Sequence, residues 1–193
     1  MSDHDSAGEG SETLTPAAVD DLAAAYEQAE PFDLVEREHV DTLPPALAAG
    51  DFGRRDAEWV VQWYYRRRAI PDADRRAAEE QFLDNDYEVL VDAITAAAAA
   101  TDRERKLEQL RSLTGVDVAV GSAFLAFLHP ETYVAIGERE WMGLYHAGEL
   151  LDSPPPSFAA ADYWRYLDTV TAVADRVDRD LWTVYRALWR LDA

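Results

Sequence analysis

The sequence predicts an all-α protein built as a single multi-helix domain. No segment alternates polar and apolar residues with the period of two that a half-buried β-strand requires. Apolar residues recur instead at helical spacing, as at Trp59, Val60, Trp63 and Tyr64, which form one stripe of a helix. With 193 residues, 48% of them hydrophobic, the chain is long and apolar enough for one sizeable core.

Capping residues and prolines predict where the helices begin and end. Thr15 and Pro16 supply an N-cap and an N1 proline for the first helix. Pro44 and Pro45 predict a new helical turn, which the glycines that follow would end. In addition to this turn we expect about nine helices: over 17–28, from Asp56, from Pro71, from Asn85 or Asp86, from Thr101, and over 118–128, 138–146, 159–177 and 179–191.

The charge balance is strongly negative. The chain has 38 acidic and 18 basic residues, for a formal charge of −20, and 17 of the basic residues are arginine, with Lys106 the one lysine. A negative surface keeps a protein soluble where salt screens ordinary charge repulsion. This composition resembles that of proteins from salt-accumulating haloarchaea, so the acidity does not by itself exclude a nucleic-acid partner.

The absence of cysteine excludes disulfides, thiolate zinc sites and cysteine nucleophiles. The chain has no apolar run of membrane-spanning length, and its polar, acidic start differs from a signal peptide. The expected protein is therefore soluble and cytoplasmic, without a membrane partner. Residues 1–13 are expected to be a disordered acidic tail, and residues 14–193 to form the helical domain.

The most informative segment runs from Leu113 to Pro130. A helix ends at Leu113, Gly115 permits a tight turn, and an apolar helix rich in small residues follows. Such a turn leaves the first N–H groups of the second helix unpaired, which makes it a natural seat for a phosphate. This pattern predicts a hairpin of two helices over about 103–128.

The hairpin resembles the helix-hairpin-helix motif, whose usual form is Leu-Pro-Gly-Val-Gly followed by a helix; here it is Leu113-Thr-Gly-Val-Asp117. The segment His129-Pro-Glu-Thr-Tyr-Val-Ala-Ile-Gly-Glu-Arg-Glu-Trp141 is similar to the one that carries the catalytic aspartate of helix-hairpin-helix DNA glycosylases. The resemblance, which touches about residues 50 to 190, is to prokaryotic 8-oxoguanine DNA glycosylase-like proteins. It implies an all-helical fold and double-stranded DNA as the partner.

The departures from that family bear on catalysis. The family's lysine position falls on Ala119, which excludes a Schiff-base lyase mechanism. Its aspartate position falls on Gly137, although Glu138, one residue along, could supply a carboxylate to a monofunctional glycosylase. Asp117 replaces the second glycine of the motif, where it either repels a phosphate or caps the following helix; we favour the cap.

The candidate DNA-binding residues combine the hairpin turn with a local excess of arginine. Between Asp51 and Arg76 the chain has seven arginines against five acids, which is unusual in so acidic a protein. These arginines either form a surface that binds nucleic acid or pair with neighbouring acids across helix faces. The candidates are Thr114, Gly115, Val116, Arg66, Arg67, Arg68 and Arg139.

The aromatic residues allow two interpretations. The tryptophans, with Tyr64 and Tyr65, could form a pocket that stacks on a flipped base, but residues at helical spacing more often pack in a core. His39 and His4 are expected in a loop and in the tail, and His129 at the end of a helix. No metal-ligand or nucleotide-binding motif is present, so we expect no metal and no cofactor.

Two function hypotheses follow. The first is a DNA-binding protein of DNA glycosylase-like fold, catalytically degenerate or at most a monofunctional base-excision glycosylase without lyase activity that uses Glu138. The second is a non-catalytic helical interaction module with no role on DNA. The replacements at Ala119, Gly137 and Asp117 favour binding over catalysis.

Overall fold

The structure is a computed structural model that describes residues 14–191, and within this range every regular element is an α-helix. The disordered tail expected over residues 1–13, including His4, lies outside the described residues. Ten helices are described: α1 (Pro16–Ala29), α2 (Asp33–Ala49), α3 (Arg54–Arg66), α4 (Asp72–Leu83), α5 (Tyr87–Ala99), α6 (Arg103–Arg111), α7 (Val118–Leu128), α8 (Glu138–His146), α9 (Ala160–Val177) and α10 (Leu181–Leu191).

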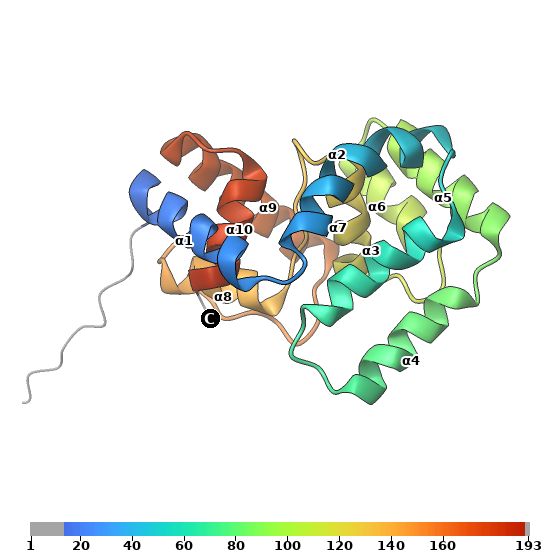
Figure 1. Cartoon of the computed structure of the whole chain (residues 1–193), viewed down its shortest axis with the longest axis horizontal. Coiled ribbons are helices and arrows are strands. Elements are labelled where there is room, and N and C mark those ends of the chain that lie inside the picture. Colours follow the sequence, from blue (N-terminus) through green and yellow to red (C-terminus); the bar gives the residue numbers. More distant parts are fainter. Residues whose placement is uncertain (1–13, 192–193) are drawn as a thin grey trace, which may run out of the picture.

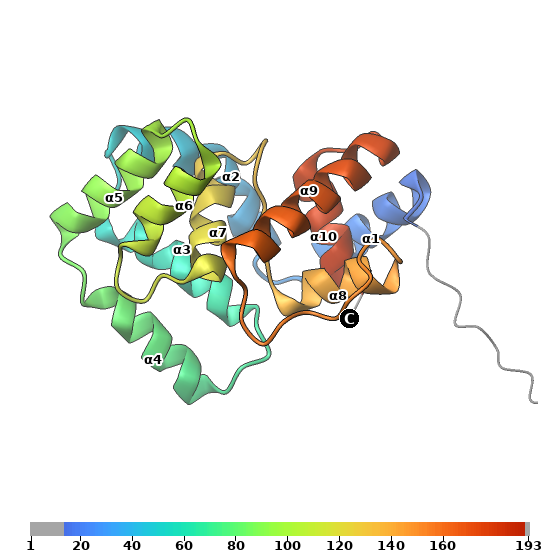
Figure 2. The ribbon, with the colours of Figure 1, turned by 180° about the vertical axis from the view of Figure 1, so that it is seen from behind.

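The helices form two groups that lie side by side (Figures 1 and 2). The middle of the chain, α3 to α7, makes one group, and α1 with α8, α9 and α10 makes the other. The second group joins distant parts of the sequence, because α1 packs along α10. Helix α2 packs on α5 and α7 of the first group, its Glu36 binds Arg186 of α10 in the second, and α7 also contacts α9.

Helix α7 lies at the centre of the fold. All eleven of its residues are buried, which agrees with a sequence that is apolar on every side of the helix. Gly121 lets α6 approach closely, since a Cβ there would lie 2.8 Å from the Leu107 side chain. The all-α fold class and the helix predicted over 118–128 are confirmed. No helix within residues 14–191 has the length and apolar character needed to cross a membrane.

The largest error of the sequence-based prediction is α2. Pro44 and Pro45 do not open a new turn but lie inside a continuous helix of 17 residues. Prolines normally break a helix, yet burial of Leu43 and Leu47 against α5 and α7 holds this one together. His39 is therefore helical rather than in a loop, and its ring stacks on Trp59 with centroids 3.8 Å apart.

Side-chain caps explain most of the helix starts. Thr15, Asp102 and Asp117 each accept a hydrogen bond from the backbone N–H three residues ahead, as their positions predict. Helix α3 begins at Arg54, before the expected Asp56 cap, because Asp56 accepts from the N–H of Gly53 instead. Helix α10 begins two residues later than expected, after Asp180, whose carboxylate binds the backbone and hydroxyl of Thr183.

Candidate nucleic-acid interface

The hairpin of α6 and α7 has the turn that its sequence predicts. Gly115 has a φ of +75°, and a Cβ there would lie 2.9 Å from the backbone nitrogen of Phe82, so both the conformation and the space require glycine. Asn85 fixes the turn by pairing with both backbone groups of Thr114, its amide donating to the carbonyl and its oxygen accepting from the N–H, each at 2.9 Å. Asn85 was predicted only as a possible helix cap.

The start of α7 has backbone N–H groups that are free to donate hydrogen bonds to a ligand. Asp117 caps the helix by accepting from Val120 N–H at 2.9 Å, which confirms the capping interpretation. The N–H groups of Gly115, Val118 and Ala119 have no hydrogen-bond partner among residues 14–191, as the first turn of a helix predicts. A phosphate approaching the turn would meet these donors, but also the exposed carboxylate of Asp117.

The C-terminal end of α3 lies beside both the hairpin and the start of α8. The Tyr64 hydroxyl donates to the Ile136 carbonyl at 3.2 Å. Burial and the nearby Asp117 carboxylate raise the pKa of Tyr65 to about 12. These contacts bring the end of α3 close to Asp117 and to Ile136, just before α8. We call the surface that carries Arg66, the turn 114–117 and Glu138 the hairpin face.

The three consecutive arginines do not form one basic surface. Arg66 is exposed, and no ion pair is found for it within the described part of the chain. Arg67 is buried and the side chain of Arg68 is 11% exposed, and their carboxylate partners come from α2 and α8, far away in the sequence. The absence of acids near Arg66–Arg68 in the sequence therefore did not mean that these side chains are unpaired. Of the three, only Arg66 remains a candidate phosphate contact.

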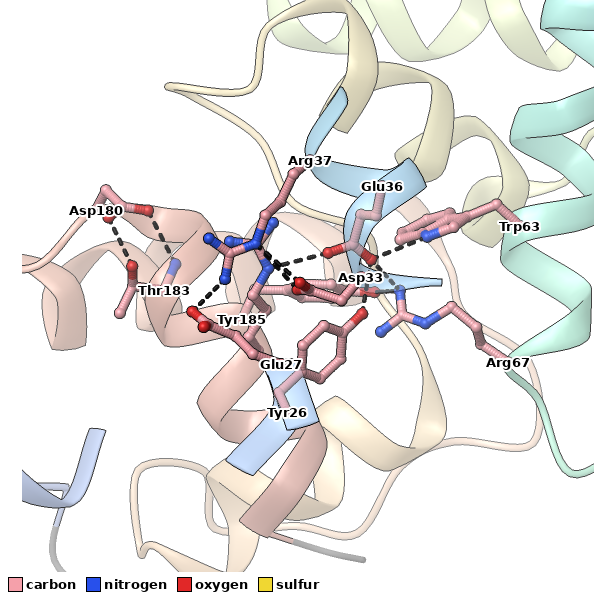
Figure 3. Close-up of polar contacts among 11 residues, drawn as sticks. Tyr26, Glu27, Asp33, Glu36, Arg37, Trp63, Arg67, Asp180, Thr183 and Tyr185 are labelled. Carbon is pink, nitrogen blue, oxygen red and sulfur yellow. Dashed lines mark hydrogen bonds and ion pairs between the residues drawn. The ribbon is translucent and has the colours of Figure 1, made fainter. Parts of the chain in front are cut away.

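Arg67 lies inside a cage of aromatic rings (Figure 3). Its guanidinium carbon is 4.5 Å from the ring centroid of Trp63 and within 5.5 Å of three further ring centroids, those of Tyr26, Tyr185 and Trp189. Its Nη1 atom donates to the Tyr185 hydroxyl at 2.8 Å. The aromatic residues considered for stacking on a base thus surround the protein's own arginine, and the core interpretation is the better one for Trp63 and Trp189.

Glu36 of α2 is the counter-ion at the centre of this cluster (Figure 3). It is fully buried, and one carboxylate oxygen accepts from the Tyr26 hydroxyl at 2.6 Å and from the Trp63 indole at 3.0 Å. The same oxygen is 3.5 Å from Arg67 Nη1, and the other accepts from Arg186 Nε at 3.0 Å. Glu36 therefore binds four side chains from three other helices, a role that its sequence context did not indicate.

A second buried ion pair occupies the space beside Gly137. Arg68 Nη1 donates to Glu140 Oε2 at 2.6 Å, and the Glu140 side chain is fully buried. Burial alone would raise the pKa of Glu140, but the guanidinium groups of Arg68 and Arg67 outweigh it and hold this pKa below its ordinary value. A Cβ on Gly137 would fall 1.8 Å from Arg68 Nη1 and 2.5 Å from Glu140 Oε2, so a side chain at this position requires the ends of these two side chains to move.

The candidate catalytic residue, Glu138, takes the first position of α8 and is exposed. It does not line the groove that α2, α9, α10 and residues 128–132 form at the C-terminal end of α7. Ala119 is buried in α7. Arg139 packs on Trp189, with its guanidinium carbon 3.6 Å from the ring centroid. Over residues 14–191, no group of three or more metal-ligating side chains is found.

Lys106 belongs to a separate buried contact with His129. Its ammonium donates to the carbonyls of Ala97 and Ala98, at the end of α5, and lies 2.8 Å from His129 Nε2. These three acceptors match the three donors of an ammonium group, which requires His129 to be neutral with its proton on Nδ1. Burial lowers the pKa of Lys106, and burial together with the Lys106 charge lowers that of His129.

This contact predicts a loss of stability in acid. Because the folded state lowers the pKa of His129, the unfolded chain binds an additional proton once the pH falls below about 6.5, and the free energy of unfolding decreases there. Urea unfolding of the wild type and of His129→Gln between pH 5 and 8 tests this, since glutamine accepts a hydrogen bond but does not titrate. The acidic residues affect both proteins alike, so the same pH dependence in both would contradict the assignment.

Comparisons with known proteins give one solved structure. No family model matches the chain, and no curated protein matches its sequence. The crystal structure of the Methanocaldococcus jannaschii 8-oxoguanine glycosylase/lyase, in complex with a 15-mer DNA containing 8-oxoguanine, is similar over 88% of this chain and 94% of that chain. The sequence identity is 12% and the TM-score 0.49, so the similarity does not extend to an activity.

Proposed function

We propose that the protein binds duplex DNA through its hairpin face and does not excise bases. The observation that carries the second part is the Arg68–Glu140 ion pair, which fills the space that a side chain at position 137 would need. The alanine at position 119 supports the same conclusion, because it offers no amine to attack a sugar. Glu138 does not suggest another catalytic centre. It is an exposed carboxylate in the first turn of α8, where an acidic side chain stabilises the helix.

The DNA-binding part rests on the hairpin. Gly115, Val118 and Ala119 have unpaired N–H groups at the positive end of α7, and Arg66 adds an exposed cation on the hairpin face. The Asp117 carboxylate opposes a phosphate there, so we expect weak binding that does not depend on base sequence. The buried side chains of Arg67 and Arg68 contribute to the fold rather than to this contact.

A matched pair of arginine variants tests this interface. Arg66→Ala is expected to weaken binding of a fluorescent duplex and to lower the slope of log affinity against log salt by about one. Arg55→Ala is the control, because Arg55 is also exposed and lies at the other end of α3, about 16 Å away along the helix. Asp117→Asn, which keeps a capping oxygen but removes the charge, is expected to tighten binding.

The same duplexes, with and without 8-oxoguanine or an abasic site, are assayed for base release. We expect none, and lesion-dependent release that disappears in Glu138→Gln would replace this proposal by a monofunctional glycosylase. Equal effects of Arg66→Ala and Arg55→Ala would contradict the hairpin face as the binding surface.

The second candidate function is a protein-interaction module without a role on DNA. The exposed apolar side chains of Leu34 and Leu151, 82% and 90% accessible, are contacts that such a module would offer to a partner. Absence of duplex binding at the lowest salt that keeps the chain folded would support this candidate over the first.

A further inference from the structure

A groove of about 950 Å³ lies between the two helix groups, at the C-terminal end of α7. Its walls come from α2, the segment 128–132, α9 and the start of α10. The hairpin face is at the opposite end of α7, some 16 Å away along the helix axis. The groove is therefore separate from the proposed DNA contact.

Arg186 forms the deepest charged part of this groove. The residue is 9% exposed and its Nε atom donates to Glu36. Its two Nη atoms have no hydrogen-bond partner in the described chain, and they are not sealed from solvent. Because Arg186 lines the groove, this free edge of the guanidinium is accessible from there.

Trp182 lies one helical turn before Arg186 on α10 and also lines the groove. The Arg186 guanidinium carbon is 5.4 Å from its ring centroid, and its indole nitrogen is a buried donor for which residues 14–191 supply no acceptor. Because Trp182 Nε1 is sealed from solvent, the donors that face the groove are the Nη atoms of Arg186. A guanidinium edge with two free Nη atoms has the geometry that binds a carboxylate or phosphate with paired hydrogen bonds.

The acidic residues of the groove lie away from its floor. Asp180 uses both carboxylate oxygens to bind Thr183 at the start of α10. Asp41, Glu131 and Asp175 are exposed, so they belong to the outer rim. The groove therefore has the Arg186 guanidinium at depth. At its opening it has these three acids, together with Arg37 and Arg179, which are paired with acids outside the groove. This arrangement favours a ligand that carries an anionic group at one end and a cationic group at the other.

We propose that the groove binds a small zwitterion, with its carboxylate or phosphate on Arg186 and its ammonium group towards the rim acids. Arg179, in the wall, adds a positive charge, although it also pairs with Asp20 of α1. The two anionic groups are distinguished with 4-aminobutyrate and O-phosphoethanolamine, which share an ammonium end. Acetate and inorganic phosphate are the matching probes without that end.

Calorimetric titration of the full chain at constant ionic strength tests the site. One of the two zwitterions is expected to bind at least about tenfold more tightly than the matching simple anion, since the rim acids contribute only to the former. Arg186→Lys keeps the charge beside Glu36 but removes the paired donors, and is expected to weaken binding about tenfold or more.

Three further variants test the site by changes that do not touch the buried Glu36–Arg186 pair. Thr171→Trp on α9 fills the groove from a half-buried position without touching its charges, and is expected to abolish binding. Arg179→Ala is expected to weaken binding, whereas Arg176→Ala, which also loses an exposed ion pair but lies outside the groove, is not. No binding of either zwitterion to the wild type, or binding that Thr171→Trp leaves unchanged, would overturn the proposal.

Discussion

Replacement of Glu36 by glutamine is expected to lower the free energy of unfolding by about 3–5 kcal/mol. The carboxylate is fully buried and lies within 3.5 Å of guanidinium nitrogens of both Arg67 and Arg186. Glutamine keeps the shape and one acceptor oxygen but leaves two buried cations without a counter-ion. Removing one partner of a buried ionic cluster is strongly destabilising for this reason, even where the intact cluster adds little net stability.

Urea unfolding followed by tryptophan fluorescence measures this effect. Glu27→Gln is the matched control, because Glu27 also pairs with an arginine, Arg37, but both side chains are about half exposed. An exposed pair of this kind contributes about 1 kcal/mol or less. Comparable losses in the two variants would show that the Glu36 cluster does not hold α2, α3 and α10 together.

A side chain introduced at position 137 is also expected to lower the free energy of unfolding by a large amount. Gly137→Ala should lower the free energy of unfolding by about 1–3 kcal/mol, because the new methyl group must displace the Arg68 guanidinium from Glu140. Gly137→Asp, which restores the carboxylate of the glycosylase-like pattern, should destabilise the protein further without producing base release. The Asp would add a second negative charge beside the Glu140 carboxylate.

Gly53→Ala provides the control for backbone effects. Gly53 and Gly137 are both extended N-cap residues followed three positions later by an acidic residue. A Cβ on Gly53 meets only Asp56, at an ordinary distance of 3.6 Å. Any difference between the two variants therefore reports the packing around Arg68 and Glu140. A Gly137→Ala protein as stable as Gly53→Ala would mean that this space is open, and the argument against catalysis would fail.

Local signals were enough to predict the secondary structure at most positions. Thr15, Asp102 and Asp117 mark helix starts because a short polar side chain satisfies a free N–H group whatever the rest of the fold does. The apolar character of α7 likewise predicted that it would be buried. The hairpin turn followed from Gly115, whose positive φ few other residues adopt.

The sequence by itself determined an all-helical chain with a hairpin, because both depend on residues close together in the chain. Only the tertiary structure decided which charges are buried. Arg67 and Arg68 have no acid nearby in the sequence, yet they pair with Glu36 and Glu140, which other helices bring to them. Long-range packing also keeps α2 helical across its two prolines and places the Arg68 and Glu140 side chains beside Gly137. In both cases burial against distant helices outweighs the local conformational preference of the residues.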